Sequence, residues 1–129
     1  MEYAVPFEKG PETVREVVKT IRTRSINTGF PLEFRTVAAD DVWMSPFFER
    51  PSVTIAVHQY HSVDTKKLFD AAEAVFRSVD GRPHWGKRHS LTAADLRPRY
   101  PEWGRFQTVR ARLDPEGRFQ NPYTRRVLG

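Results

Sequence analysis

The six residues Arg82-Pro83-His84-Trp85-Gly86-Lys87 group an imidazole, an indole and an ammonium on a backbone stiffened by Pro and Gly. Such side chains can do chemistry, because a His exchanges protons near neutral pH and a Lys stabilises negative charge on an oxygen. The alternative is a turn in which Trp85 fills the core, His84 bonds to a carbonyl and Lys87 points to water. Composition alone favours that turn, so the other polar residues of the chain decide between the two interpretations.

Strand alternation brings a second group of polar residues together. Residues 32–37 and 53–60 alternate as strands should, and successive side chains of a strand point to opposite faces. If helices cover the apolar face, the other face carries four functional side chains: Glu33, Arg35, His58 and Tyr60. The alternative is a solvated face with a cross-strand ion pair, worth about 0.2–1 kcal/mol. His58 fits that alternative poorly, whereas Tyr60 taken alone is better explained as a half-buried edge aromatic.

The elements that position these residues are predicted from hydrophobic periodicity and turn signals. Up to Lys87 they are a strand, a helix, two strands, a helix and a short strand or extended turn, over residues 2–6, 11–24, 32–37, 53–60, 64–79 and 82–87. Asp64 is the expected N-cap of the second helix, and Asp80-Gly81 ends it. The order βαββαβ is the split arrangement of ferredoxin-like folds. We therefore expect an α+β fold, with one antiparallel sheet and both helices on one face.

The residues after Ser90 are predicted to form a C-terminal helical extension. It should hold a short helix, a longer helix, a type I turn and a final helical turn, at residues 92–96, 101–113, 114–117 and 121–128. Thr92 and Asp95 have the spacing of a capping box, with Asp in place of Glu. Pro115 and Gly117 occupy the turn positions that favour them. No repeat or flexible linker interrupts the chain, so residues 1–129 are expected to be a single domain.

Composition limits the classes of protein and site. The 129 residues suffice for one core, and a 39% hydrophobic content indicates a folded chain. The absence of cysteine excludes a disulfide scaffold, thiolate chemistry and zinc sites built on sulfur, and no pair of histidines has a helical metal-binding spacing. We therefore predict no metal site. No apolar run is long enough to span a bilayer and no secretory leader is present, so a soluble cytoplasmic protein is expected.

The net charge of +5 is unevenly distributed. Residues 1–64 carry 7 basic and 9 acidic side chains, a charge of −2, whereas residues 65–129 carry 14 basic and 7 acidic, a charge of +7. A basic half can bind nucleic acid, an anionic lipid surface or an acidic partner. No RNA-recognition signature or Gly-rich phosphate loop accompanies it, so we expect no nucleic-acid binding. The asymmetry is compatible with association at a membrane surface.

Four blocks of sequence carry a family resemblance, and they occur in order at Glu33 to Asp40 (EFRTVAAD), Ala56 to His61 (AVHQYH), Arg82 to Lys87 (RPHWGK) and Arg112 to Gly129. Together they resemble the C-terminal region of the aldonolactone and alditol oxidases. These flavoenzymes of the vanillyl-alcohol oxidase superfamily include the D-arabinono-1,4-lactone and L-gulono-1,4-lactone oxidases. The resemblance covers essentially the whole chain, and the combination of blocks is specific where any one alone would be weak.

The resemblance implies a cap, or substrate, domain that lies over an FAD held elsewhere. In such enzymes a sugar lactone or alditol loses a hydride from a carbinol carbon to flavin N5. The matching positions would assign Glu33 and Arg35 to the substrate hydroxyls, with Arg35 also polarising them. His58 and Tyr60 would lie in the same pocket. The segment His84, Trp85, Gly86 and Lys87 would face the flavin, with Lys87 also near the reacting hydroxyl.

Nothing in these residues corresponds to the FAD-binding domain of an intact family member, and no GxGxxG follows a predicted strand. Because the cofactor supplies the hard chemistry, the isolated chain is expected to be inactive without an FAD-binding domain or subunit. The alternatives are a non-catalytic polyol-binding or partner-binding module and, less favoured, a basic surface-binding protein. Residues 40–52 are predicted to be a loop that tucks its aromatics under itself. An apolar surface toward FAD is expected around Trp43, Phe47 and Trp85.

Overall fold

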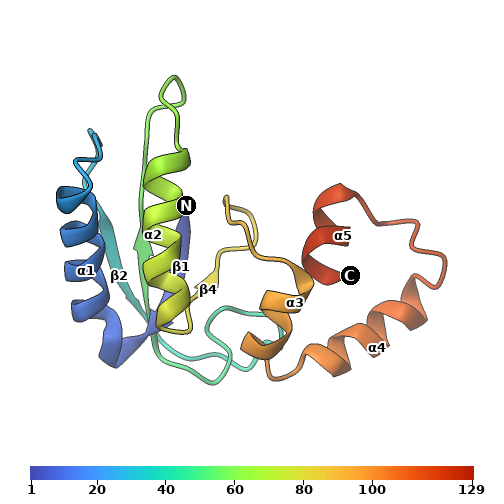
Figure 1. The fold of residues 1–129 in the computed structure, drawn as a ribbon. Coiled ribbons are helices and arrows are strands. Elements are labelled where there is room, and N and C mark those ends of the chain that lie inside the picture. The colour runs from blue at the N-terminus through green and yellow to red at the C-terminus, as the bar shows by residue number, and fades with distance from the viewer.

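The computed structural model describes residues 1–129 as a four-stranded sheet with two helices on one face and a helical extension to one side (Figure 1). In chain order the elements are β1 (Glu2–Pro6), η1 (Phe7–Lys9), α1 (Gly10–Thr23), β2 (Glu33–Val37), β3 (Ser52–Ala56), α2 (Lys66–Ser78), β4 (Arg82–Pro83), α3 (Ala93–Leu96), η2 (Arg97–Arg99), α4 (Trp103–Leu113) and α5 (Pro122–Leu128).

All neighbouring strands of the sheet are antiparallel, in the spatial order β2-β3-β1-β4. The helices α1 and α2 lie side by side on one face (Figure 1). The predicted α+β fold with helices on one face and a C-terminal helical extension is therefore confirmed. The central strands β1 and β3 are buried along their whole length, whereas β2 is the long, exposed edge of the sheet.

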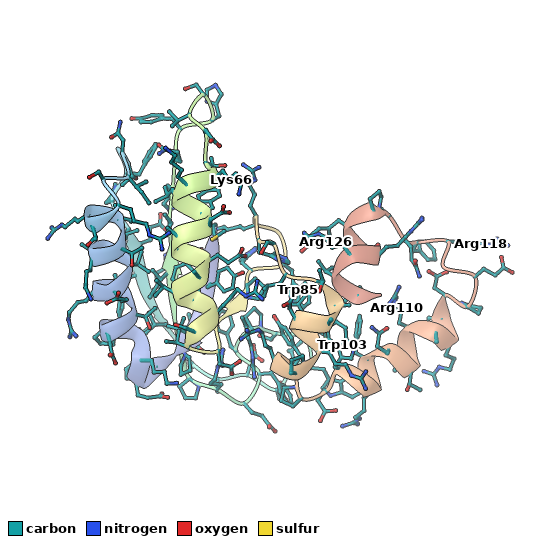
Figure 2. The ribbon with its side chains drawn as sticks, in the orientation of Figure 1. Lys66, Trp85, Trp103, Arg110, Arg118 and Arg126 are labelled. Atoms are coloured by element: carbon teal, nitrogen blue, oxygen red, sulfur yellow. The ribbon has the colours of Figure 1, made fainter.

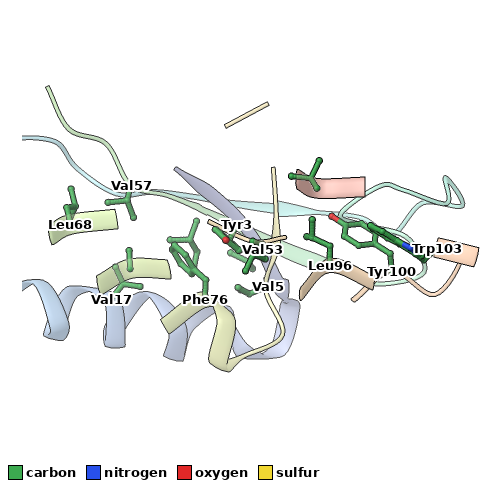
Figure 3. Close-up of a cluster of buried hydrophobic side chains, with 14 residues drawn as sticks. Tyr3, Val5, Val17, Val53, Val57, Leu68, Phe76, Leu96, Tyr100 and Trp103 are labelled. Atoms are coloured by element: carbon green, nitrogen blue, oxygen red, sulfur yellow. The ribbon is translucent and has the colours of Figure 1, made fainter. Parts of the chain in front are cut away.

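The core under the helices comes from one alternating face of the central strands (Figure 3). Tyr3, Val5, Val53 and Ile55 are each at most 1% exposed. The Tyr3 ring stacks on Phe76 of α2 at 5.0 Å between centroids. Since burying one such side chain contributes about 1.5–3 kcal/mol, this face fixes which residues of each strand point to the opposite side.

A second apolar cluster attaches the helical extension to the sheet. Leu96, Tyr100, Trp103 and Val127 join the same buried core, at its end away from Leu68 and Val17 (Figure 3). The buried Arg82 links this cluster to the loop before β3, donating to the carbonyls of Pro46 and Phe48 at 3.3 and 3.1 Å. Its guanidinium also lies 5.4 Å from the Tyr100 ring centroid. The extension is therefore packed onto the sheet unit and is not a loose tail.

Several predicted boundaries differ from the structure. The strand predicted over 53–60 ends at Ala56, because the chain turns away and the Gln59 amide bonds to the Asn27 carbonyl at 2.8 Å. The segment 82–87 was predicted as a short strand or an extended turn. Its strand covers only Arg82–Pro83, and a turn closes at Gly86.

The helix caps are partly as predicted. Thr92 and Asp95 form the expected capping box, and Asn121 caps α5. The predicted N-cap Asp64 is one residue early, since Thr65 occupies that position. The helix predicted from Pro101 begins two residues later, at Trp103. None of the helices combines the length and the apolarity needed to cross a membrane.

Candidate functional site

One row of side chains crosses the sheet on the face opposite α1 and α2. Glu33 of β2 pairs with Ala56 of β3, which pairs on its other side with Glu2 of β1. His84 continues the row, because its backbone N–H donates to the Glu2 carbonyl at 3.0 Å. The backbones of Glu33 and Glu2 stand two strands apart, about 10 Å, with Ala56 between them in the row. Ala56 is only 1% exposed, so the side chains around it cover this part of the sheet face.

The next row on this face places Arg35 beside Glu33. Arg35 pairs with Thr54, and its guanidinium contacts the Glu33 carboxylate. His58 lies on the other side of that carboxylate, with 3.6 Å between Nε2 and the Glu33 Oε1. Glu33, Arg35 and His58 are thus brought together, although His58 lies two residues beyond the end of β3 and not within a strand as predicted. The Arg35 and Glu33 side chains are 58% and 41% exposed, so their pair contributes little to folding.

His58 is held as a neutral imidazole. Burial lowers its pKa below the ordinary value, and the nearby positive charges of the N-terminus, Lys87 and Arg35 lower it further. Its contact with Glu33 is therefore not an ion pair near neutral pH. The Nε2 atom is buried and has no hydrogen-bond partner. A neutral ring nitrogen can donate or accept one hydrogen bond, so this unpartnered nitrogen beside a carboxylate is a candidate contact for a hydroxyl group.

Lys87 reaches this face through Glu2, a site residue that the sequence analysis missed. Its Nζ lies 2.5 Å from the Glu2 Oε2, and the Glu2 side chain is only 8% exposed. A buried carboxylate requires such a partner, because leaving it unpaired is costly. The signal was available in the first predicted strand, where Glu2 alternates with Tyr3 and shares a face with Ala4. A charged residue opposite the core-facing positions of a central strand indicates a buried polar site.

The stiff segment around Trp85 is held from two sides. The indole Nε1 donates to the Met44 carbonyl at 2.8 Å, and the Tyr123 hydroxyl donates to the Trp85 carbonyl at 2.5 Å. Figure 2 shows Trp85 between the sheet and the C-terminal helices. The packing role proposed as an alternative is thus real for Trp85, which is half-buried against Tyr100. It serves to fix the backbone that carries Lys87.

A tight turn aims the rest of the segment. The Lys87 N–H donates to the His84 carbonyl at 3.0 Å, and the Gly86 N–H donates to the His84 Nδ1 at 3.0 Å. A Cβ at Gly86 would lie 3.3 Å from the His84 ring, so glycine allows this close approach. His84 is exposed and acts as an acceptor, which differs from the bond to a carbonyl considered in the turn alternative.

Two hollows meet at this segment. The first, of about 180 Å³, has Ala4 and Thr54 as its floor and is lined by Glu2, Pro46, Phe47, His84 and Trp85. The loop before β3 thus covers part of the face that the sequence analysis expected to be open. The second, of about 490 Å³, is lined by Trp85, Gly86, Lys87, Arg88, His89, Tyr123 and Arg126, with no carboxylate among them. Lys87 lines the second hollow, and its ammonium pairs with Glu2, which lines the first.

Tyr60 lies apart from the sheet row. It follows the end of β3, is largely exposed, and its ring centroid is 4.5 Å from that of Phe30. Its predicted position on the strand face is therefore wrong, because the strand ends four residues earlier. Phe30 also lies 6.2 Å from His58, so Tyr60 and His58 share one aromatic neighbour. Glu33, Arg35 and His58 do lie together. No group of three or more acidic or His side chains is placed to hold a metal ion.

An apolar hollow adjoins the site on the side of the extension. About 440 Å³ in volume, it is lined mainly by apolar residues that include Val42, Met44, Trp85, Phe106 and Val127. Of the aromatics expected at an apolar surface, Trp43, Phe47 and Trp85 are all half-buried, so none is lost in the core. Trp43 is covered on one side by Arg105, whose guanidinium lies 4.3 Å from the ring centroid.

The comparisons with known proteins identify the family. The model of the D-arabinono-1,4-lactone oxidase family matches residues 1–127. The chain belongs to this family. It is 50% identical over 129 residues to the L-gulono-1,4-lactone dehydrogenase of Mycobacterium tuberculosis, covering 100% of this chain and 30% of that protein. It is 34% identical to the L-gulonolactone oxidase of Bos taurus, with 98% and 30% covered. The alditol oxidase of a Streptomyces species is 38% identical over 99 residues, 74% of this chain and 23% of that enzyme. The chain thus spans 30% of the length of the first two oxidoreductases and 23% of the third.

Proposed function

We propose that this chain is the substrate-domain portion, from the C-terminal region, of an FAD-dependent oxidase or dehydrogenase of the D-arabinono-1,4-lactone and alditol type. It would act only together with an FAD-binding part of the protein. The observation that carries the proposal is the meeting of Glu33, Arg35, His58 and the Glu2–Lys87 pair on one face of the sheet. The family of the chain suggests the class of reaction. The side chains on this face are the residues that we propose to bind and activate the substrate.

The four side chains have complementary roles toward a sugar hydroxyl. The Glu33 carboxylate would accept a hydrogen bond from a substrate hydroxyl and orient it. Arg35 and Lys87 would stabilise negative charge as the hydroxyl proton leaves, a form of electrostatic stabilisation that exceeds its value in water when the site is closed. The neutral His58, whose Nε2 makes no hydrogen bond within the chain, would receive that proton. Hydride acceptance would be the chemistry of the bound FAD.

The surface around Trp85 fits one wall of a flavin site. Pro46, Phe47 and Trp85 offer apolar contact, and Lys87 offers a positive charge beside it. The residues that would approach FAD are His84, Trp85, Gly86 and Lys87. A hollow of about 180 Å³ is smaller than the ~300–1,000 Å³ of typical ligand pockets, so this chain would supply only part of the enclosure.

A chimera tests the proposal. In it, this chain replaces the matching 30% of the M. tuberculosis L-gulono-1,4-lactone dehydrogenase. We expect the isolated chain to be colourless and inactive. The chimera should show the visible absorbance of bound flavin and reduce an acceptor dye with L-gulono-1,4-lactone. Arg35→Met should lower kcat/KM about 10²- to 10³-fold without loss of flavin, because Arg35 is exposed and its removal leaves the core intact.

The matched control is Arg15→Met, which removes an exposed arginine from α1 on the opposite side of the sheet. It should leave kcat/KM unchanged. A yellow, active isolated chain would contradict the need for a second part. A flavin-loaded, inactive chimera that still binds lactones would instead favour a non-catalytic polyol-binding module.

A further inference from the structure

The strand β2 leaves half of its backbone hydrogen-bonding groups without a partner strand. In an antiparallel pair, successive residues direct their N–H and C=O groups alternately to either side. The bond from the Val57 N–H to the Met1 carbonyl shows that odd-numbered residues of this part of the chain face β1. Thr54 and Ala56 therefore bond to β2, through Arg35 and Glu33. The backbone groups of Phe34 and Thr36 point outward from the sheet edge.

This edge lacks two of the features that usually prevent further pairing, a β-bulge and a proline. The five residues of β2 pair with β3 in continuous register, with no bulge, and none is a proline. Phe34 is 43% exposed, although it lies on the same face as the buried Ile55 and Tyr3. An exposed, straight edge with a large apolar side chain is a site for strand addition.

We propose that β2 is an interior strand of the complete protein, paired on its free edge with a strand from the part of the oxidase that this chain does not contain. The identity of that partner rests on the proposed function. The relatives are over three times as long as this chain, so residues for such a strand exist in the family. Pairing would also cover Glu33 and Arg35, which now stand 41% and 58% exposed in the candidate site.

A second copy of this chain is a weaker candidate for the same edge. Two five-residue strands joined edge to edge would bury far less than the roughly 1,200 Å² of a stable interface. A strand from the same protein needs no such area, because the rest of its domain packs with it. Strand addition would then provide hydrogen-bond partners for the backbone N–H and C=O groups of Phe34 and Thr36. It would also fix the backbone that carries the Glu33–Arg35 pair.

Thr36→Pro tests whether the outward-facing N–H of Thr36 bonds to an added strand. Proline removes the Thr36 N–H, which makes no bond within this sheet, and edge strands tolerate proline on such a side. Its matched control is Thr36→Ala, which keeps the N–H. In the isolated chain the two variants should melt at about the same temperature. In the chimera described above, Thr36→Pro should melt about 2 °C or more below Thr36→Ala, because a bond to the added strand is lost.

Hydrogen exchange on the unmodified proteins gives an answer even if Thr36→Pro fails to fold. In the isolated chain the amides of Phe34 and Thr36 should exchange freely while that of Arg35 is protected. In the chimera they should slow about 100-fold or more. Equal exchange in both proteins, or protection in the isolated chain together with a dimeric mass by light scattering, overturns the proposal. Because exchange is independent of turnover, an active chimera with unprotected edge amides would refute strand addition and leave the proposed function intact.

Discussion

Glu2 and Glu33 flank Ala56 in one row of the sheet, yet their surroundings differ. Glu2 is 8% exposed, lies on a central strand and is paired with Lys87 from a segment anchored on both sides. Glu33 is 41% exposed, lies on the edge strand and contacts only Arg35 and His58. The polar face thus has a built half around Glu2 and an open half around Glu33.

Because of this difference, the residues around Glu2 contribute to stability, whereas those around Glu33 are available for binding and chemistry. In the built half a carboxylate has been taken out of water, so each partner has a structural consequence when removed. In the open half the charges remain solvated and contribute little to stability. Residues of the open half are therefore the better probes of chemistry, while those of the built half test how the chain positions Lys87.

Acid should destabilise the fold through His89, which gives the largest expected effect. Burial and the charge of Arg126 lower the pKa of this His from 6.5 to about 4. Between pH 6.5 and pH 4, His89 is protonated in the unfolded chain but neutral in the folded chain. The free energy of unfolding therefore falls as the pH drops below 6.5 and continues to fall toward pH 4. At about 1.4 kcal/mol per pH unit, urea unfolding should show a loss of about 2 to 3 kcal/mol between about pH 6.5 and pH 4.5.

The control for this prediction is His89→Gln. Its amide can still donate toward the Tyr123 hydroxyl, which lies 3.0 Å from the His89 Nε2 and itself bonds to the Trp85 carbonyl. Glutamine does not titrate, whereas the carboxylates and His58 titrate in both proteins. The variant should therefore lose less stability than the parent over this range. Identical pH profiles would show that His89 is not held neutral by the fold.

Removing the charge of Glu2 should have the next largest effect. Glu2→Gln leaves the Lys87 ammonium without its anionic partner, and Lys87 is itself 37% exposed, so solvent moderates the penalty. We expect the free energy of unfolding in urea to fall by about 1–3 kcal/mol. The double variant Glu2→Gln with Lys87→Met should recover part of the loss, since an uncharged pair needs no compensation. A double variant no more stable than Glu2→Gln alone would show that the ion pair is not the cause.

The sequence predicted the open half well and the built half poorly. Alternation in β2 sufficed to place Glu33 beside Arg35, because strand geometry is local. The Glu2–Lys87 pair joins residues 85 positions apart, and it depends on the sheet order and on the bonds that hold Trp85. Tyr60 was misplaced for the same reason, since the end of β3 is set by the contact of Gln59 with Asn27 rather than by residue pattern.

The smallest effect is expected for Glu33→Gln, and it tests the comparison directly. Gln keeps the shape of the side chain and removes one solvated charge from beside Arg35. The free energy of unfolding should change by no more than about 0.5 kcal/mol, against the larger loss for Glu2→Gln in the same row. Urea unfolding at low and high salt measures this, because screening should erase any remaining difference. A loss equal to that of Glu2→Gln would mean that Glu33 is a structural carboxylate. Its exposure on the edge strand would then no longer single it out as a residue for binding substrate.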